Sequence, residues 1–189
     1  MNVPQLTVKF TTLLFLSLSA CSTLVGNVKP VDEKSEQYEI IELSPEGWTK
    51  LDPTSLVSEK ARFDPKSSTY SSEVTDLTYQ SKKTAGIISL NSSCRSGRAQ
   101  EENLELITRE LLLGITGVTL RTDQKISVQT TPALQTTVQG KIAGELTKIR
   151  TVVLSRGECI YDLMYVSTPE RFKTHEEDFN RFVSSLRLR

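Results

Sequence analysis

The single histidine, His175, is the first residue to consider for chemistry, because a Ser-His-Asp or Cys-His arrangement needs an imidazole as its base. Asp178 lies three residues later, so on a helix the two side chains would share a face and could also hold a metal. His175 falls on the apolar stripe of the last predicted helix, however, and one imidazole beside adjacent acids makes a poor transition-metal site. We therefore expect His175 to pack at the edge of the core, and we expect no catalytic, metal or cofactor site.

The second residue to consider for chemistry is Cys21, which follows the apolar run "FTTLLFLSLSA". The run is shorter than the roughly 20 residues that span a bilayer as a helix, and it suits the apolar region of a signal peptide. Leu18-Ser19-Ala20-Cys21 resembles the lipobox of bacterial lipoproteins, which implies cleavage before Cys21 and a palmitate-bearing lipid on its sulfur. Ser22 in place of Asp implies sorting to the outer membrane, facing the periplasm. The alternative is an ordinary signal peptide with a chance cysteine.

The two other cysteines, Cys94 and Cys159, remain as an even pair once Cys21 carries a lipid. They would then lie in an oxidising compartment, where disulfides persist. Cys94 ends one predicted strand and Cys159 begins another, so the two could meet at one edge of a sheet. We expect a disulfide between them, and two free thiols are the alternative.

Two further groups of residues could bind a partner. The segment "NSSCRSGR" at 91–98 could present backbone N–H groups and arginines to an anion, although a polar strand-to-helix connection crosslinked by Cys94 explains it more simply. Trp48, Tyr161 and Tyr165 could mark an interface, where aromatic residues are enriched. Tyr161 and Tyr165 lie on the same face of one predicted strand, so at least one of them is expected in the core.

Alternating and β-prone segments predict an antiparallel sheet. A lead-in strand is expected at 38–43, a turn just before Trp48, and a surface loop at 63–73. Gly140 and Gly144 flank an expected hairpin turn or bulge. The main expected strands cover residues 76–81, 84–92, 118–129, 132–155 (as a hairpin) and 158–167.

Two helices should pack on this sheet. The first has its apolar residues three and four apart, with Glu101 and Glu102 in its first turn and a stop at Gly114 or Gly117. The last begins with Thr168 as its cap and Pro169 in its first turn. The apolar stripes are Leu104, Ile107, Leu111 and Ile115 in the first helix, and Phe172, His175, Phe179, Val183 and Leu186 in the last.

The length of the chain limits the number of its domains, and its charge limits the kinds of partner that it can bind. The sequence predicts a signal peptide at 1–20, a flexible tether at 21–37 and one globular α+β domain at 38–189, whose size suffices for a well-buried core. The 23 basic residues balance 23 acidic ones. A nucleic-acid-binding domain would need a strongly basic face, so this class of partner is excluded.

Three segments together resemble the PsbP-like superfamily: "EGWTKLD" at 46–52, the strand run at 132–167 and the closing "TPERFKTHEEDFNRFVSSLRL" at 168–188. The resemblance covers most of residues 40–189 and is based on the pattern of these segments, without an invariant motif. It implies an α/β/α sandwich and a non-catalytic protein that works by binding others. It carries over no functional residues, since that superfamily has no shared active-site signature.

These observations lead us to expect a lipid-anchored accessory module of an envelope complex. Its partners would be the membrane, through the lipid on Cys21, and an envelope protein. The alternative is a carrier of a lipid or small apolar ligand between sheet and helix. A hydrolase that uses His175 is a third and weaker reading, and we expect no enzyme.

Overall fold

The protein is described here by a computed structural model that covers residues 38–52, 76–94 and 103–189. The expected signal peptide, Cys21, the tether and the expected surface loop at 63–73 lie outside these residues. Glu101 and Glu102 also lie outside them. Within the described residues, no helix is long and apolar enough to cross a membrane.

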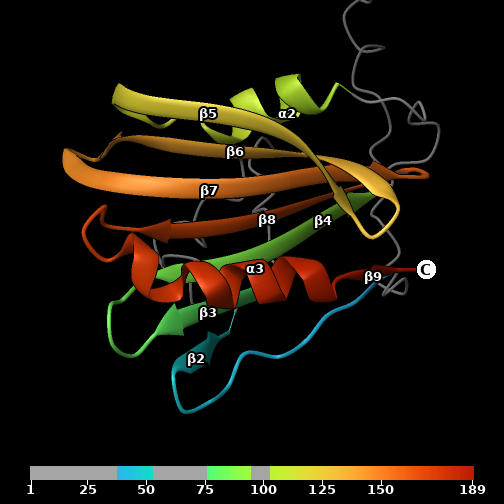
Figure 1. Ribbon diagram of the computed structural model, residues 1–189, viewed down its shortest axis with the longest axis horizontal. Coiled ribbons are helices and arrows are strands. Elements are labelled where there is room, and N and C mark those ends of the chain that lie inside the picture. Colours follow the sequence, from blue (N-terminus) through green and yellow to red (C-terminus); the bar gives the residue numbers. More distant parts are fainter. Residues whose placement is uncertain (1–37, 53–75, 95–102) are drawn as a thin grey trace, which may run out of the picture. The chain divides into compact units, whose positions relative to one another are not determined.

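A seven-stranded antiparallel sheet forms the centre of the fold, in the order β2-β3-β4-β8-β7-β6-β5 (Figure 1). A two-stranded sheet joins the two ends of the described chain, β1 (Tyr38–Glu39) and β9 (Arg187–Leu188). The strands of the large sheet are β2 (Trp48–Leu51), β3 (Leu77–Ser81), β4 (Ile87–Cys94), β5 (Thr116–Val128), β6 (Thr131–Ile142), β7 (Glu145–Arg156) and β8 (Cys159–Ser167).

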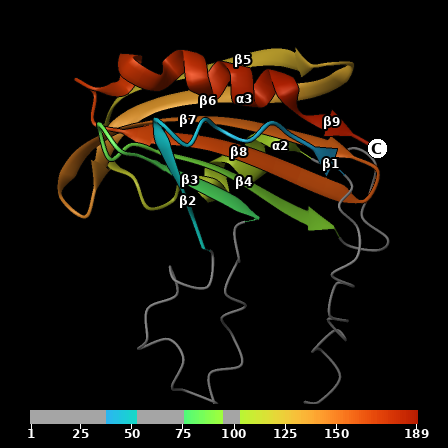
Figure 2. The ribbon, with the colours of Figure 1, turned by 90° about the horizontal axis from the view of Figure 1, so that it is seen from below.

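Helices cover both faces of this sheet, α3 (Glu176–Ser185) on one side and α2 (Leu104–Leu111) on the other (Figure 2). Because side chains alternate along a strand, β8 sends Leu163 and Tyr165 to the α3 face and Met164 and Val166 to the α2 face. The larger core lies under α3, and its fully buried aromatic side chains are Tyr161, Tyr165, Phe172, Phe179 and Phe182. The expected α+β class and the α/β/α layering are confirmed.

Both helices begin or end differently from the prediction. Asn103 caps α2 by accepting from the N–H of Leu106 at 3.1 Å, and the helix ends at Leu111 in a turn before either glycine. Ile115 therefore lies beyond the helix, although it still packs on the core of the α2 face.

The last helix does not begin at Pro169. A 3₁₀ helix covers Phe172–His175, and only then does α3 start at Glu176. The cause lies at Phe172, because its carbonyl accepts from the Tyr165 hydroxyl at 2.9 Å and the ring packs on Tyr165. This places a tight turn where regular α-helix was expected. The predicted apolar stripe, from Phe172 through Leu186, is buried as expected.

The turn between β6 and β7 is Ala143–Gly144, with φ values of 50° and 89°. Two consecutive positive φ values are typical of a type I′ hairpin, where glycine is favoured. Gly144 is therefore in the turn, whereas Gly140 lies inside β6 instead of flanking it. A Cβ at Gly140 would lie 2.6 Å from the Ile115 side chain, so a close approach of two segments requires this glycine.

Candidate functional site

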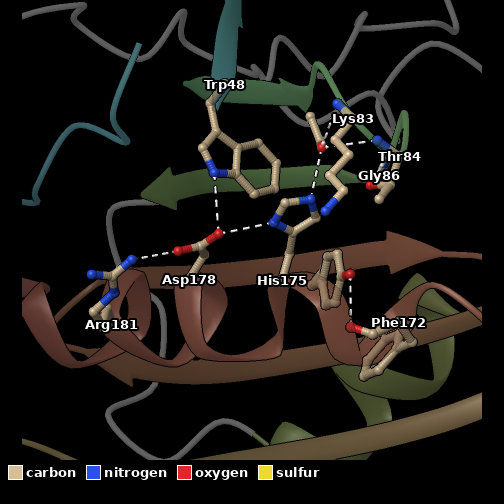
Figure 3. A network of polar contacts seen from close by, with 10 residues as sticks. Trp48, Lys83, Thr84, Gly86, Phe172, His175, Asp178 and Arg181 are labelled. Carbon is tan, nitrogen blue, oxygen red and sulfur yellow. Dashed lines mark hydrogen bonds and ion pairs between the residues drawn. The ribbon is translucent and has the colours of Figure 1, made fainter. Parts of the chain in front are cut away.

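A chain of polar side chains links β2, β3 and α3 at the edge of the larger core (Figure 3). The Ser81 hydroxyl lies 2.7 Å from His175 Nε2, and His175 Nδ1 lies 2.9 Å from Asp178 Oδ2. Trp48 Nε1 donates to the same carboxylate at 3.3 Å, and Arg181 forms an ion pair with its other oxygen. The indole of Trp48 also packs edge-on against the imidazole.

The order of contacts from Ser81 through His175 to Asp178 is that of a hydrolase triad. The hydroxyl of Ser81 accepts from the backbone N–H groups of Lys83 at 3.2 Å and Thr84 at 3.1 Å, so its own proton is directed to His175 Nε2. The remaining ring proton then lies on Nδ1 and is donated to Asp178. In this pattern Nε2 accepts and Nδ1 donates.

The surroundings of Ser81 differ from those of a nucleophile. Both lone pairs of its hydroxyl accept backbone N–H groups, and only 3% of the residue is exposed. A carbonyl substrate needs a free lone pair and space close to the attacking oxygen. The network therefore has a structural role in this conformation: through Ser81 it holds the β3–β4 turn against the start of α3.

Asp178 is the charged centre of this network. Partial burial raises the pKa of its carboxyl, but hydrogen bonds from His175, Arg181 and Trp48 favour the ionised form more strongly, and the net pKa is lowered. The folded state therefore prefers ionised Asp178 more than the unfolded chain does. That preference is a source of stability at neutral pH.

Replacing Asp178 with Asn should reduce the free energy of unfolding at pH 7 by about 1–3 kcal/mol, because hydrogen bonds to a charged group are lost. Since the folded pKa is lowered, wild-type Asp178 contributes fully above the unfolded value of about 3.9, and the contribution disappears as pH falls through the folded pKa. Urea unfolding at pH 7 and at lower pH should show the two proteins converging on acidification.

Glu177→Gln is the matched control, because it removes a carboxylate from the exposed side of the same helical turn. We expect it to change stability much less. A stability difference between Asp178→Asn and wild type that stays constant across pH would contradict the role assigned to the ionised carboxylate.

The expected disulfide joins Cys94 and Cys159. The two residues are direct partners in the register of β4 and β8, with their Cα atoms 4.0 Å apart. The bridge lies at the end of both strands, as their predicted positions indicated. This site prediction is confirmed.

The other candidate binding residues are used inside the fold. Trp48, Tyr161 and Tyr165 are all buried, so the interpretation of this set as a binding surface is wrong. Ser92 belongs to β4, and its hydroxyl donates to Asp76. The arginines of the 91–98 segment lie outside the described residues. Among the residues that the structure describes, no group of three potential ligands is placed to hold a metal ion.

Figure 1 shows that the start of β5 and the β6–β7 hairpin lie at the same end of the sheet, and large apolar side chains are exposed there. The register brings these segments together, because Lys141 of β6 pairs with Thr116 on one side and Leu146 on the other. We call this surface the apolar rim, and its residues, 38–76% exposed, are Leu113, Val118, Leu120, Ile142 and Leu146.

Comparisons with known proteins identify the fold class. No described protein family and no curated protein matches the sequence. Among solved structures, CyanoP, the cyanobacterial PsbP of Synechocystis sp. PCC 6803, superimposes with a TM-score of 0.53 at 12% identity, covering 87% of this chain and 96% of its own. The domain therefore has a PsbP-like fold.

Two further solved structures are similar. A Bacteroides thetaiotaomicron protein gives a TM-score of 0.50 at 7% identity, covering 81% of this chain and 45% of its own. A Pseudomonas aeruginosa protein of unknown function gives 0.48 at 18% identity, covering 58% and 78%. At identities this low, structural similarity concerns the fold alone, and the activity of the domain must be argued from its own residues.

Sequence reasoning identified His175 and Asp178 but missed Ser81 and Trp48 as their partners. Ser81 is 94 residues from His175, and Trp48 is 130 residues from Asp178. No local pattern signals such pairs. The apolar rim was also missed, because exposed leucine and valine on a strand look the same in sequence as buried ones.

Proposed function

We propose that the chain is a lipid-anchored lipoprotein of the bacterial envelope, and that its domain is a non-catalytic binding module of an envelope complex. The lipid on Cys21 supplies attachment to the membrane, most simply the outer membrane, and the domain faces the periplasm. The partner is an envelope protein that contacts the domain through apolar side chains.

The apolar rim is the observation that carries this proposal. Five large aliphatic side chains gather at one end of the sheet and remain exposed, Leu113 by 76%. By the register, Leu120 and Leu146 lie on one face of the sheet and Ile142 on the other, so the apolar rim runs around the end of the sheet. Exposed apolar surface gathered in this way is typical of an interaction site. Lys141 and Glu145 lie among them, which gives the polar surroundings typical of an interface.

Changing Cys21 to Ala should leave an unprocessed precursor or a protein released from the membrane. Acyl chains stabilise membrane attachment by about 0.8 kcal/mol per buried CH₂ group, so a lipid with several chains makes attachment effectively permanent. Membrane fractionation and mass spectrometry of the N-terminal peptide measure the outcome. Ser22→Ala is the control and should remain acylated. Normal acylation of the Cys21→Ala variant would contradict the assignment of Cys21 as the lipidated residue.

The binding role is tested by capture from detergent-solubilised envelopes with the full-length lipidated protein. Leu146→Glu places a charge in the apolar rim and should lose the captured partner. Thr49→Glu is the matched control, because it places the same charge at an exposed position of β2, at the other edge of the sheet. Equal capture by both variants, or no specific capture by wild type, would contradict the proposal.

The non-catalytic part of the proposal depends on the buried and doubly hydrogen-bonded hydroxyl of Ser81. The purified protein should not hydrolyse esters or amides. An esterase or amidase activity that disappears in Ser81→Ala, while the variant stays folded, would overturn it.

A carrier of a small ligand is the second candidate function, and one observation favours it. A surface groove of about 490 Å³ lies between the C-terminal half of α3 and the β5–β6 hairpin. Ile126 and Val183 give it apolar walls, and Arg187 adds a positive charge. If the protein is a carrier, native mass spectrometry of protein purified from envelopes should show a bound species. The mass of the protein alone would contradict this function.

A further inference from the structure

Strand β5 is an edge strand with an unusually long exposed side. It spans 13 residues and is exposed from Thr116 to Lys125, whereas β2 at the opposite edge has only four residues. Its register with β6 is irregular between Thr116 and Leu120 and regular from Leu120 to Val128. In the described part of the chain, no strand pairs with the outer side of β5. A long edge presents a row of N–H and C=O groups that a further strand can pair with.

The sequence of β5 is complementary to itself about its midpoint, Thr122. When two copies of the strand pair antiparallel about a two-fold axis at this residue, position 122 + n faces position 122 − n of the second copy. Arg121 then faces Asp123 of the second copy, and by symmetry the same pair forms twice. Unlike charges directly opposite each other stabilise neighbouring strands.

The neighbouring registers are less favourable than this one. An axis at Arg121 would place that guanidinium opposite its own copy, and an axis at Asp123 would oppose two carboxylates, which is destabilising. An axis at Gln124 also opposes unlike charges, Asp123 to Lys125, but a lysine ammonium lacks the paired donors with which a guanidinium holds a carboxylate. Only the Thr122 axis forms Arg–carboxylate pairs, and Thr122 lies in the part of β5, Leu120 to Val128, that pairs regularly with β6.

The charged pair is already positioned for this contact. Arg121 Nε donates to Asp123 Oδ2 at 3.0 Å, and the Thr136 hydroxyl donates to Oδ1 at 2.6 Å, so the carboxylate is held in place. A guanidinium has five N–H donors. Both side chains stay about 40% exposed, so Arg121 can reach a second carboxylate as well as its own.

We propose that two copies of this chain form a symmetric dimer in which β5 pairs antiparallel with β5 about Thr122, so that one sheet continues through both copies. The pairing covers Leu120 of the apolar rim. Leu113, Ile142 and Leu146 remain open on each copy. The dimer does not depend on the proposed function, but it would present two such surfaces to a partner.

A cysteine placed on the axis provides the test. Residue 122 would face its own copy with Cα atoms about 4.5–5.5 Å apart, a range that a disulfide can bridge. Thr122→Cys in the full-length protein should therefore give a covalent dimer on mild oxidation in membranes. In Gln124→Cys the two added thiols would be displaced by four residues, roughly 13 Å along the strands, and should not join.

Non-reducing electrophoresis measures the dimer, and the protein without an added cysteine gives the background. Strong crosslinking of Thr122→Cys alone supports the proposal. Equal crosslinking of both variants, crosslinking of Gln124→Cys alone, or background levels in both would overturn it.

Charge exchange gives an independent measurement. Arg121→Asp in the Thr122→Cys background opposes two carboxylates twice and should reduce crosslinking ~tenfold, as two unfavourable cross-strand pairs imply. Adding Asp123→Arg restores unlike pairs and should recover the dimer. Circular dichroism of each variant confirms folding, and a double exchange that fails to recover the dimer although folded would also overturn the register.

Discussion

Phe179→Ala should lower the free energy of unfolding by about 3–5 kcal/mol, as expected when a fully buried phenylalanine is truncated. Phe179 has no exposed surface and lies on the face of α3 that meets the sheet. Its ring stacks on Tyr165, with ring centres 5.9 Å apart. Truncation would remove this contact and leave a cavity that the surrounding aromatic side chains cannot fill, since they are themselves fixed by packing.

Urea unfolding followed by circular dichroism measures this change. Asn180→Ala is the control, because it changes the next residue of the helix, which is exposed, and should shift stability by about 0.5 kcal/mol or less. A loss below about 1 kcal/mol in Phe179→Ala would mean that α3 does not pack on the sheet through this face.

Replacing both Cys94 and Cys159 with Ala should cost roughly 4 kcal/mol. The disulfide joins residues 65 positions apart, and closing a loop of that length restricts the unfolded chain. The direct pairing of the two residues at the ends of β4 and β8 means that the bridge follows the sheet register. The cost therefore arises mainly from the greater freedom of the unfolded chain.

Reductant provides the matched comparison. Reduced wild type should unfold at nearly the same urea concentration as the double variant, and reductant should have no effect on the variant. Two alkylated thiols at Cys94 and Cys159 in the unreduced, denatured protein would contradict the bridge. A double variant as stable as oxidised wild type would contradict its energetic role.

Local pattern alone determined the order of elements in this protein. Alternating apolar residues predicted the strands, and the spacing of Phe172, Phe179 and Val183 predicted which side chains of the closing segment are buried. These properties follow from backbone periodicity, which acts over a few residues. The disulfide could also be predicted from the sequence, because Cys94 and Cys159 lie at the ends of two predicted strands, which limited where a bridge could form.

Contacts between distant segments decided the rest. The start of α3 depends on the Tyr165 hydroxyl reaching the carbonyl of Phe172, and the network at His175 depends on Ser81 arriving from β3. The exposed edge exists only because the sheet order places β5 outermost. Strand order and register arise from the packing of both sheet faces at once, a long-range property that no short stretch of sequence contains.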